Sequence, residues 1–198
     1  NIDQPILNDP LPVAETDYLV VESTYGNRLH DKPKDVRAEL TEVLQRAFDR
    51  GGSVIIPAFA VGRTQELLYL LREIKQKKLV HGHDGFPVYL DSPLAEEATS
   101  VFLQCDADCF DPETQAVLKS GQNPIWCPGL QFAITAEESK AINSDPRSKV
   151  ILSASGMCDA GRIRHHLKHN LWMAENIILI AGYQSKGTLG RALLDGVK

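Results

Sequence analysis

The stretch SVIIPAFAVGRTQELL, residues 53–68, passes from a short β-branched run through a loop of small residues into an amphipathic segment. Residues 53–57 predict a buried strand, because a short apolar run bounded by glycine and proline is typical of one. Residues 58–62 predict a loop, and residues 63–77 predict the helix that follows it. This order of strand, loop and helix recurs along the chain, and it is the repeating unit of a parallel sheet with crossover helices.

The same alternation extends in both directions from this stretch. Upstream, residues 17–21 (DYLVV) predict a short buried strand, and residues 33–50 predict a helix whose apolar residues recur on one face. Downstream, we expect strands at 87–90, 149–152 and 176–180, and helices that begin near 94, 112 and 136 or span 159–171 and 188–194. We therefore expect an α/β fold, with a parallel, Rossmann-like sheet and helices on both of its faces.

The composition is that of a globular domain. The chain has 198 residues, of which 43 % are hydrophobic and 24 % charged, so it can bury a core of ordinary size. Its 21 Lys and Arg against 26 Asp and Glu give a net charge of −5, which disfavours a basic nucleic-acid coat protein but allows a local basic site. No apolar run approaches the ~20 residues of a membrane span, so we expect no membrane partner. The opening residues also lack the pattern of a secretory leader.

The four cysteines are scattered along the chain and form no C-x-x-C pair. A domain of this size needs no disulfide to hold its core, so we expect free thiols in a reducing compartment and a cytoplasmic protein. A metal site at Cys105 and Cys109 is disfavoured, because no second pair of ligands lies near them in the sequence.

Ligands of open parallel sheets bind outside the carboxyl ends of the strands, so the residues after each expected strand are the first candidates for a site. Small, hydroxyl, glycine and charged residues follow these strands in the segments ESTYGNR (22–28), PAFAVGRT (57–64), DSP (91–93), SASGM (153–157) and AGYQSKG (181–187). Such loops at one predicted edge of a sheet indicate a shared polar cleft.

Two of these loops suit an anion. Arg63 lies at the start of its predicted helix, where the helix dipole disfavours a cation unless an anion lies between them. Residues 153–156 place hydroxyls and backbone N–H groups at another helix start, where phosphate would be favoured. Structural interpretations stay open: Glu22 alone would be a solvated strand-end carboxylate, residues 91–93 would cap a helix, and residues 153–156 would be a tight turn.

The histidines invite a metal interpretation that the spacing does not support. His81 and His83 lie in a glycine-rich turn, and no third and fourth ligands stand nearby. A second group occupies one predicted helix but lacks the glutamate of an H-E-x-x-H zinc site. With the neighbouring cations, this group predicts a basic helix face, solvated or in contact with an anionic partner: Arg162, Arg164, His165, His166, Lys168 and His169.

Motifs of nucleotide-binding proteins and serine hydrolases are absent. The sequence has no G-x-G-x-x-G, and residues 182–188 (GYQSKGT) imitate a Walker A loop with the lysine misplaced. Residues 153–156 lack the G-x-S-x-G elbow of the serine hydrolases. An unrelated nucleotide-binding α/β domain is therefore disfavoured.

Five segments in order closely resemble the β-CASP ribonucleases of the metallo-β-lactamase superfamily. They are ESTYGNR (22–28), PAFAVGRTQELL (57–68), YLDSPLA (89–95), ILSASGMCDAGRIRHHL (151–167) and AGYQSKGTLGR (181–191). The resemblance covers nearly the whole chain and is weakest between residues 105 and 147. That family includes the cleavage-and-polyadenylation endonuclease, and the bacterial-type members are the most similar.

The resemblance implies a two-domain, zinc-dependent nuclease. In that family a metallo-β-lactamase domain holds two zinc ions, a parallel α/β insert closes over it, and RNA lies between them while zinc-bound hydroxide attacks a phosphodiester. Glu22 matches the family's acidic residue, which pairs with a histidine near the metals, so a catalytic role is implied for it. Substrate-binding roles at the cleft are implied for Arg63, Ser92, Ser153, Ser155, Gly156, Arg162 and Tyr183.

The sequence departs from the family because its H-x-H-x-D-H zinc signature is absent. The resemblance implies an insert cut close to both borders: residues 1–16 from the metallo-β-lactamase part, 17–194 as the β-CASP domain, and 195–198 as the start of the return. An enzyme that naturally lost its zinc domain is the less favoured alternative. We expect no zinc pair and no activity on this chain alone; its expected partners are RNA and the missing metallo-β-lactamase domain.

A second function remains open beside the nuclease. The chain could derive from a non-catalytic RNA-binding or scaffold paralogue, although Glu22 argues for an active parent. The RNA target, the choice between endo- and exonucleolytic cleavage, and a homodimer are also left open by the sequence.

Overall fold

Five parallel strands form one central sheet in the part of the chain that the structure, a computed structural model, describes, residues 4–27 and 35–196. The strands are β1 (Val54–Pro57), β2 (Val88–Asp91), β3 (Leu130–Phe132), β4 (Val150–Ser153) and β5 (Ile177–Ile178). Their order across the sheet is β3-β2-β4-β1-β5, and every pairing is parallel. The long central strands are buried throughout, as expected for a parallel sheet with both faces covered.

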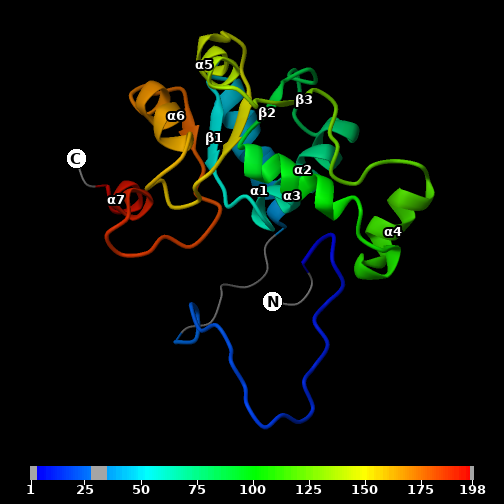
Figure 1. Cartoon of the computed structure of the whole chain (residues 1–198). Coiled ribbons are helices and arrows are strands. Elements are labelled where there is room, and N and C mark those ends of the chain that lie inside the picture. The colour runs from blue at the N-terminus through cyan, green and yellow to red at the C-terminus, as the bar shows by residue number, and fades with distance from the viewer. Residues whose placement is uncertain (1–3, 28–34, 197–198) are drawn as a thin grey trace.

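Helices connect the strands as crossovers (Figure 1). Side-chain oxygens cap several of their first turns, including the Thr135 hydroxyl and Glu138 carboxylate of the predicted capping box. The helices are α1 (Val36–Phe48), α2 (Arg63–Gln76), α3 (Pro93–Phe102), α4 (Pro112–Lys119), α5 (Ala136–Ser144), α6 (Ile163–Asn170) and α7 (Leu189–Asp195), with a 3₁₀ turn at Ala107–Cys109.

The core has two layers, one on each face of the sheet. Val54 and Ile56 of β1 pack with α1 and α2, whereas Ile55 between them packs with α5 and α6. This alternation is the period-two pattern of a strand with both faces covered. The predicted α/β fold, with helices on both faces of a parallel sheet, is therefore confirmed.

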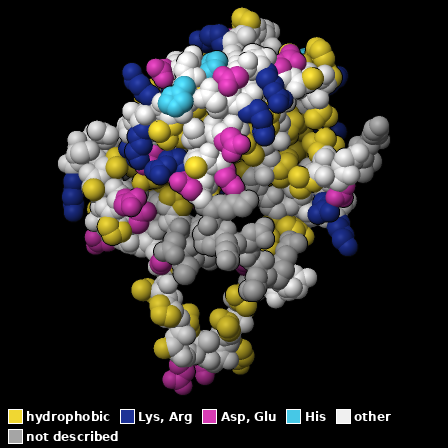
Figure 2. Space-filling view, turned by 180° about the vertical axis from the view of Figure 1, so that it is seen from behind, with side chains coloured by type: hydrophobic (Ala, Val, Ile, Leu, Met, Phe, Trp, Pro, Cys, Tyr) yellow, Lys and Arg dark blue, Asp and Glu magenta, His cyan; other side chains and the backbone are white. Residues whose placement is uncertain are grey.

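The predicted strand at residues 17–21 is wrong for this structure. The segment is extended without strand pairing, and Tyr18 is 91 % and Val20 98 % exposed. It belongs to the long loop that leaves the body in Figure 1 after Ile6 and Leu7, which contact Phe110, and that carries hydrophobic side chains at the bottom of Figure 2. A strand needs a hydrogen-bonding neighbour, and none contacts this segment within the described residues.

The register of the central strands aligns their carboxyl ends. Pro57 of β1 and Asp91 of β2 are both the partners of Ser153 of β4, so the three loops that follow start from one edge. This edge is where open parallel sheets bind ligands, and the loops there determine the candidate site.

Two further features bear on the sequence predictions. All four cysteines are free, and burial raises the pKa of the Cys127 and Cys158 thiols to about 11. Among residues 4–27 and 35–196, no helix has the length and apolar character needed to span a membrane.

Candidate functional site

Packing at the carboxyl edge joins the loops after β1, β4 and β5. Gly156 lies under the Phe59 ring so closely that a Cβ at this position would stand 2.7 Å from Phe59 Cδ2. The Gln184 side-chain amide donates a 2.8 Å hydrogen bond to the Gly156 carbonyl, and Gly190 N–H donates a 2.9 Å bond to Met157. Three of the sequence segments that were predicted to share a cleft are therefore in direct contact.

Glu22 lies just before a turn at residues 24–27, and this turn contacts the edge through Tyr25. Its Oε2 accepts a 2.9 Å hydrogen bond from Thr24 N–H, and the Tyr25 ring meets the Tyr183 ring edge-on at 5.6 Å between centroids. The hydrogen bonds from the Thr24 backbone and side chain lower the pKa of Glu22, so the exposed carboxylate is ionised at neutral pH. The structure thus places an ionised, exposed carboxylate three residues before Tyr25, whose ring contacts Tyr183, one of the predicted cleft residues.

A buried polar network lies beneath these loops, centred on Asp91 at the end of β2. Its Oδ1 accepts a 2.7 Å bond from Arg162, and its Oδ2 accepts 2.5 Å bonds from the His166 Nε2 and the Ser139 hydroxyl. Burial works to raise the pKa of Asp91, but the hydrogen bonds from His166, Ser139 and Arg162 outweigh it and hold the pKa below its ordinary value. Asp91 is therefore a buried carboxylate with a full set of donors.

Arg162 ties this network to the neighbouring loop after β3. Besides Asp91, its guanidinium donates to the carbonyl oxygens of Ala133 at 2.7 Å and Ile134 at 2.6 Å. These contacts fix the residue just before α6, and so they fix the end of the 153–161 loop that precedes that helix. Arg162 positions the loop, and its predicted contact with substrate stays a prediction.

The predicted serines have internal partners. Ser92 is buried and caps α3, where its hydroxyl accepts from Ala95 N–H, so the capping interpretation of residues 91–93 is confirmed. Ser153 is buried and donates to the Asp91 carbonyl at 2.9 Å. Ser155 is partly accessible and shares its hydroxyl with the backbone of Ala160. These bonds show how the serines shape the edge, while their contacts with substrate stay predictions.

Arg63 opens α2 as expected, but its guanidinium leans along the helix. It forms a 2.6 Å ion pair with Glu66, one turn further on, and its side chain is 40 % exposed. An ion pair between side chains three residues apart in one helix is weak, and this one is only partly buried, so the guanidinium is available to a competing anion. The predicted anion-binding role of Arg63 is compatible with this position and stays a prediction.

The predicted basic face of α6 requires a correction. His166 is fully buried against Asp91, and Arg162 turns inward, so neither belongs to an outer basic face. A sequence signal for this was present: Ile163, His166, Leu167 and Asn170 follow the spacing of a helical stripe, and all four are buried. The sequence interpretation missed the Asp91 network because it grouped the histidines by charge and not by helical face.

The described residues contain no group of side chains that could hold a pair of zinc ions. Nowhere in 4–27 or 35–196 do three His, Cys, Asp or Glu side chains converge on a point that a metal ion could occupy. His83 Nε2 lies 3.0 Å from Asp49, and His81 uses its backbone to bond Gln45. The described residues therefore do not fit a catalytic zinc site.

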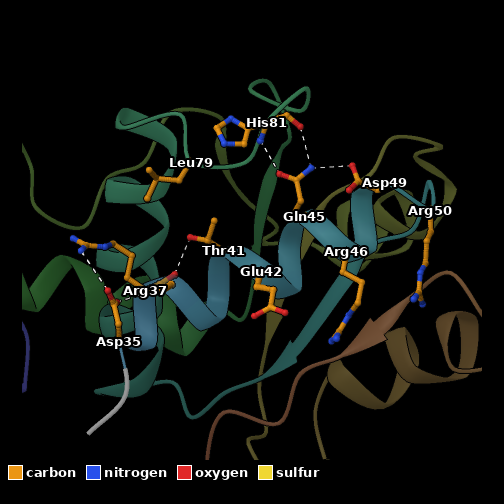
Figure 3. A pocket seen from close by; sticks show the side chains of 11 residues that line it. Asp35, Arg37, Thr41, Glu42, Gln45, Arg46, Asp49, Arg50, Leu79 and His81 are labelled. Carbon is orange, nitrogen blue, oxygen red and sulfur yellow. Dashed lines mark hydrogen bonds and ion pairs between the residues drawn. The ribbon is translucent and has the colours of Figure 1, made fainter.

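A hollow of about 740 Å³ runs along α1, and Figure 3 shows the side chains that line it. Its polar groups pair with one another: Gln45 bonds the backbone of His81 and the Asp49 carboxylate, and Arg37 pairs with Asp35. None of the predicted site residues lines this hollow. It therefore contributes nothing to the candidate site.

Comparison with known proteins matches this chain to a family. The model of the Beta-Casp domain matches residues 64–193. Over 98 % of its length the chain is 38 % identical to Ribonuclease TTHA0252 of Thermus thermophilus, and over its whole length it is 34 % identical to an RNase J-like protein of Methanocaldococcus jannaschii. It is also 28 % identical, over 98 % of its length, to Endoribonuclease YSH1 of Kluyveromyces lactis.

The chain spans only part of these relatives. It covers 44 % of the Thermus and Methanocaldococcus proteins and 25 % of the Kluyveromyces protein. The relatives' names therefore describe proteins that are longer than the segment compared.

Proposed function

This chain belongs to the Beta-Casp domain family, and from that membership we propose that it forms one wall of an RNA-binding cleft in a nuclease that hydrolyses RNA phosphodiesters. The names of its relatives, a ribonuclease and an endoribonuclease, support this class of activity. In this proposal the chain binds and orients RNA, and it supplies one acidic side chain to the chemistry.

The observation that carries the proposal is the convergence of loops at the carboxyl edge. Phe59 over Gly156, Gln184 on Gly156 and Tyr25 against Tyr183 bring four distant segments of the sequence to one place. Aromatic rings and backbone polar groups together suit RNA, whose bases stack and whose phosphates accept hydrogen bonds. The buried Asp91 network supports this edge from below.

Arg63 supplies the positive charge in this proposal. At the start of α2 an anion would be favoured both by the helix dipole and by the guanidinium. An RNA phosphate would replace Glu66 as the partner of Arg63, at little cost because an ion pair between neighbouring turns of one helix is weak. The net negative charge of the chain makes this local contact weak and sensitive to salt.

Glu22 is the acidic residue that we assign to the chemistry. Its carboxylate is exposed, ionised and fixed by Thr24, so it is free to accept a hydrogen bond from a group outside this chain. We propose that Glu22 orients a histidine in the rest of the protein. Its negative charge would also stabilise the protonated form of that histidine.

The rest of the nuclease would lie against the extended segment at residues 18–21. Tyr18, Leu19, Val20 and Val21 are all exposed, and an exposed apolar run of this kind is typical of an interface. A metallo-β-lactamase domain packed there would hold the zinc ions, since the described residues offer no such site. On this proposal the chain alone hydrolyses nothing.

The experiment that tests this proposal measures RNA binding and RNA hydrolysis separately. A labelled single-stranded RNA should bind the chain weakly, and the full-length protein should bind and cleave it. Arg63→Ala should weaken binding in both, whereas Arg50→Ala, which removes an exposed arginine in the turn after α1, should not. Binding without cleavage by the full-length protein would favour the non-catalytic RNA-binding alternative, and unchanged affinity in Arg63→Ala would remove the phosphate contact.

A further inference from the structure

The outer side of α6 carries a hollow that none of the predicted site residues lines. Its volume is about 760 Å³, and Arg164, Lys168, Leu171, Trp172 and Leu189 all line it. We call these five residues the α6 flank. The buried Asp91 network contributes no residue to it, and the loops at the carboxyl edge contribute only Gly161, the last residue before Arg162, so its composition needs a separate explanation.

Trp172 is the most unusual member of the flank. It is one of two tryptophans in the chain and is 78 % exposed, and the neighbouring Leu171 is 51 % exposed. A tryptophan carries a large apolar surface that folding normally buries, so its exposure beside another apolar side chain is typical of a binding surface. Its flat ring is suited to stacking.

Two positively charged side chains precede this tryptophan at regular helical spacing. Arg164, Lys168 and Trp172 are spaced four residues apart, which places them along one side of α6 and its C-terminal end. Within the described residues no carboxylate forms an ion pair with Arg164 or Lys168; the Arg164 guanidinium donates to the Asp159 carbonyl, at 3.3 Å. The flank therefore presents two cations without an ion-pair partner among the described residues, on a chain whose net charge is −5.

The titration of a neighbouring group agrees with this positive surrounding. The pKa of His165 is lowered, first by partial burial and then by the charges of His169, His166, Lys140 and Lys168. Lys140 belongs to α5, so the positive field has contributions from two helices. An anion in the hollow would relieve this repulsion.

The topology connects the flank to the cleft. α6 starts at the carboxyl edge, directly after the 153–161 loop, and Trp172 follows its last turn at the opposite end of the helix. A strand of RNA that leaves the cleft at the start of α6 would therefore pass Arg164, Lys168 and Trp172 in turn. Exposed aromatic rings alternating with cations are the pattern of surfaces that bind single-stranded nucleic acid.

We propose that the α6 flank is a second RNA-binding surface, which holds the single-stranded RNA outside the cleft by stacking a base on Trp172 and contacting phosphates through Arg164 and Lys168. This proposal rests on the proposed function, because it extends the path of the same RNA. It predicts that affinity increases with RNA length once the strand reaches the flank. An acidic protein segment is the competing occupant, and the experiment below separates the two.

The experiment compares oligouridylates of about 6 and about 20 nucleotides on the chain and on the full-length protein. The long RNA should bind more tightly, and Trp172→Ala and Lys168→Gln should each reduce its affinity roughly fivefold, as expected for one lost stack or phosphate contact, with no effect on the short RNA. Trp172→Phe should restore part of the affinity. Lys119→Gln, which removes an exposed cation from the distant α4, should change the affinity for neither the short nor the long RNA.

Tryptophan fluorescence gives a direct readout of contact. In Trp126→Phe only Trp172 remains, and the long RNA should quench its emission; in Trp172→Phe only Trp126 remains, and quenching should be absent. If the Trp172 variants bind the long RNA as tightly as the original protein does, the flank proposal is overturned, whereas the proposed RNA-binding cleft is not affected. Polyglutamate that quenches Trp172 as strongly as RNA does would also overturn it. If the full-length protein binds neither the short RNA nor the long RNA, both proposals are overturned.

Discussion

His166 Nε2 lies 2.5 Å from Asp91 Oδ2, and both side chains are fully buried. The contact joins the end of β2 to the middle of α6, and Arg162 occupies the other carboxylate oxygen of Asp91 at 2.7 Å. A single carboxylate thus anchors the helix that follows the 153–161 loop. The accessible loops of the candidate site therefore depend for their position on the buried side chains of Asp91 and His166 beneath them.

Asp91→Asn should destabilise the chain strongly. The substitution keeps the size of the side chain but leaves Arg162 and His166 without their negative partner, and a broken buried pair typically costs about 3 kcal/mol. Urea unfolding followed by circular dichroism measures the loss. Asp106→Asn, at an exposed residue whose side chain caps nothing, is the matched control and should be neutral. Equal stability of the two variants would show that the Asp91 network does not hold the fold.

The contribution of Asp91 to stability should depend on pH. The pKa of Asp91 is lower in the folded chain than in the unfolded chain, where it is about 4. Its contribution to stability is therefore present above the unfolded pKa and is lost as the pH falls through the folded pKa. The stability difference between the original chain and Asp91→Asn should therefore be constant from neutral pH to mildly acid pH and shrink below about pH 4. A difference that grows on acidification has the wrong sign for this account.

Gly156→Ala should disturb the contact that joins two of the loops. The added Cβ would stand 2.7 Å from the Phe59 ring, so the ring or the loop must move, at a cost of about 1–2 kcal/mol. Removing the ring first should remove most of this cost. A double-mutant cycle with Phe59→Ala measures the coupling, and strictly additive losses of stability would mean that Phe59 does not constrain Gly156.

Periodicity in the sequence was enough to predict most of the fold. The alternation of short apolar strands with one-sided helices predicted β1, β2, β4, β5 and the helices around them. It missed β3, a three-residue strand without a distinctive pattern, because its pairing with β2 comes from tertiary contact. The predicted strand at 17–21 failed for a related reason, since no described segment pairs with it.

The candidate site was predictable only as far as the edge of the sheet. The rule that ligands bind at the carboxyl ends of parallel strands located the loops that Gly156, Phe59 and Gln184 bring together. The inward direction of Arg162 and His166 depends on the buried charge of Asp91, which lies more than seventy residues away in the sequence. Helical spacing alone carries no information about such a partner.

The central claim is tested most directly by Glu22→Gln in the full-length protein. The measurement is single-turnover cleavage of RNA at saturating enzyme, with zinc content and RNA affinity determined on the same sample. The account predicts a loss of rate of ~10²–10⁴-fold, the usual contribution of acid–base catalysis, with folding, metal content and affinity nearly unchanged. The control Glu137→Gln, an exposed glutamate in the first turn of α5, should retain full activity. A Glu22→Gln rate within about threefold of the original, well short of the acid–base range, would contradict the account.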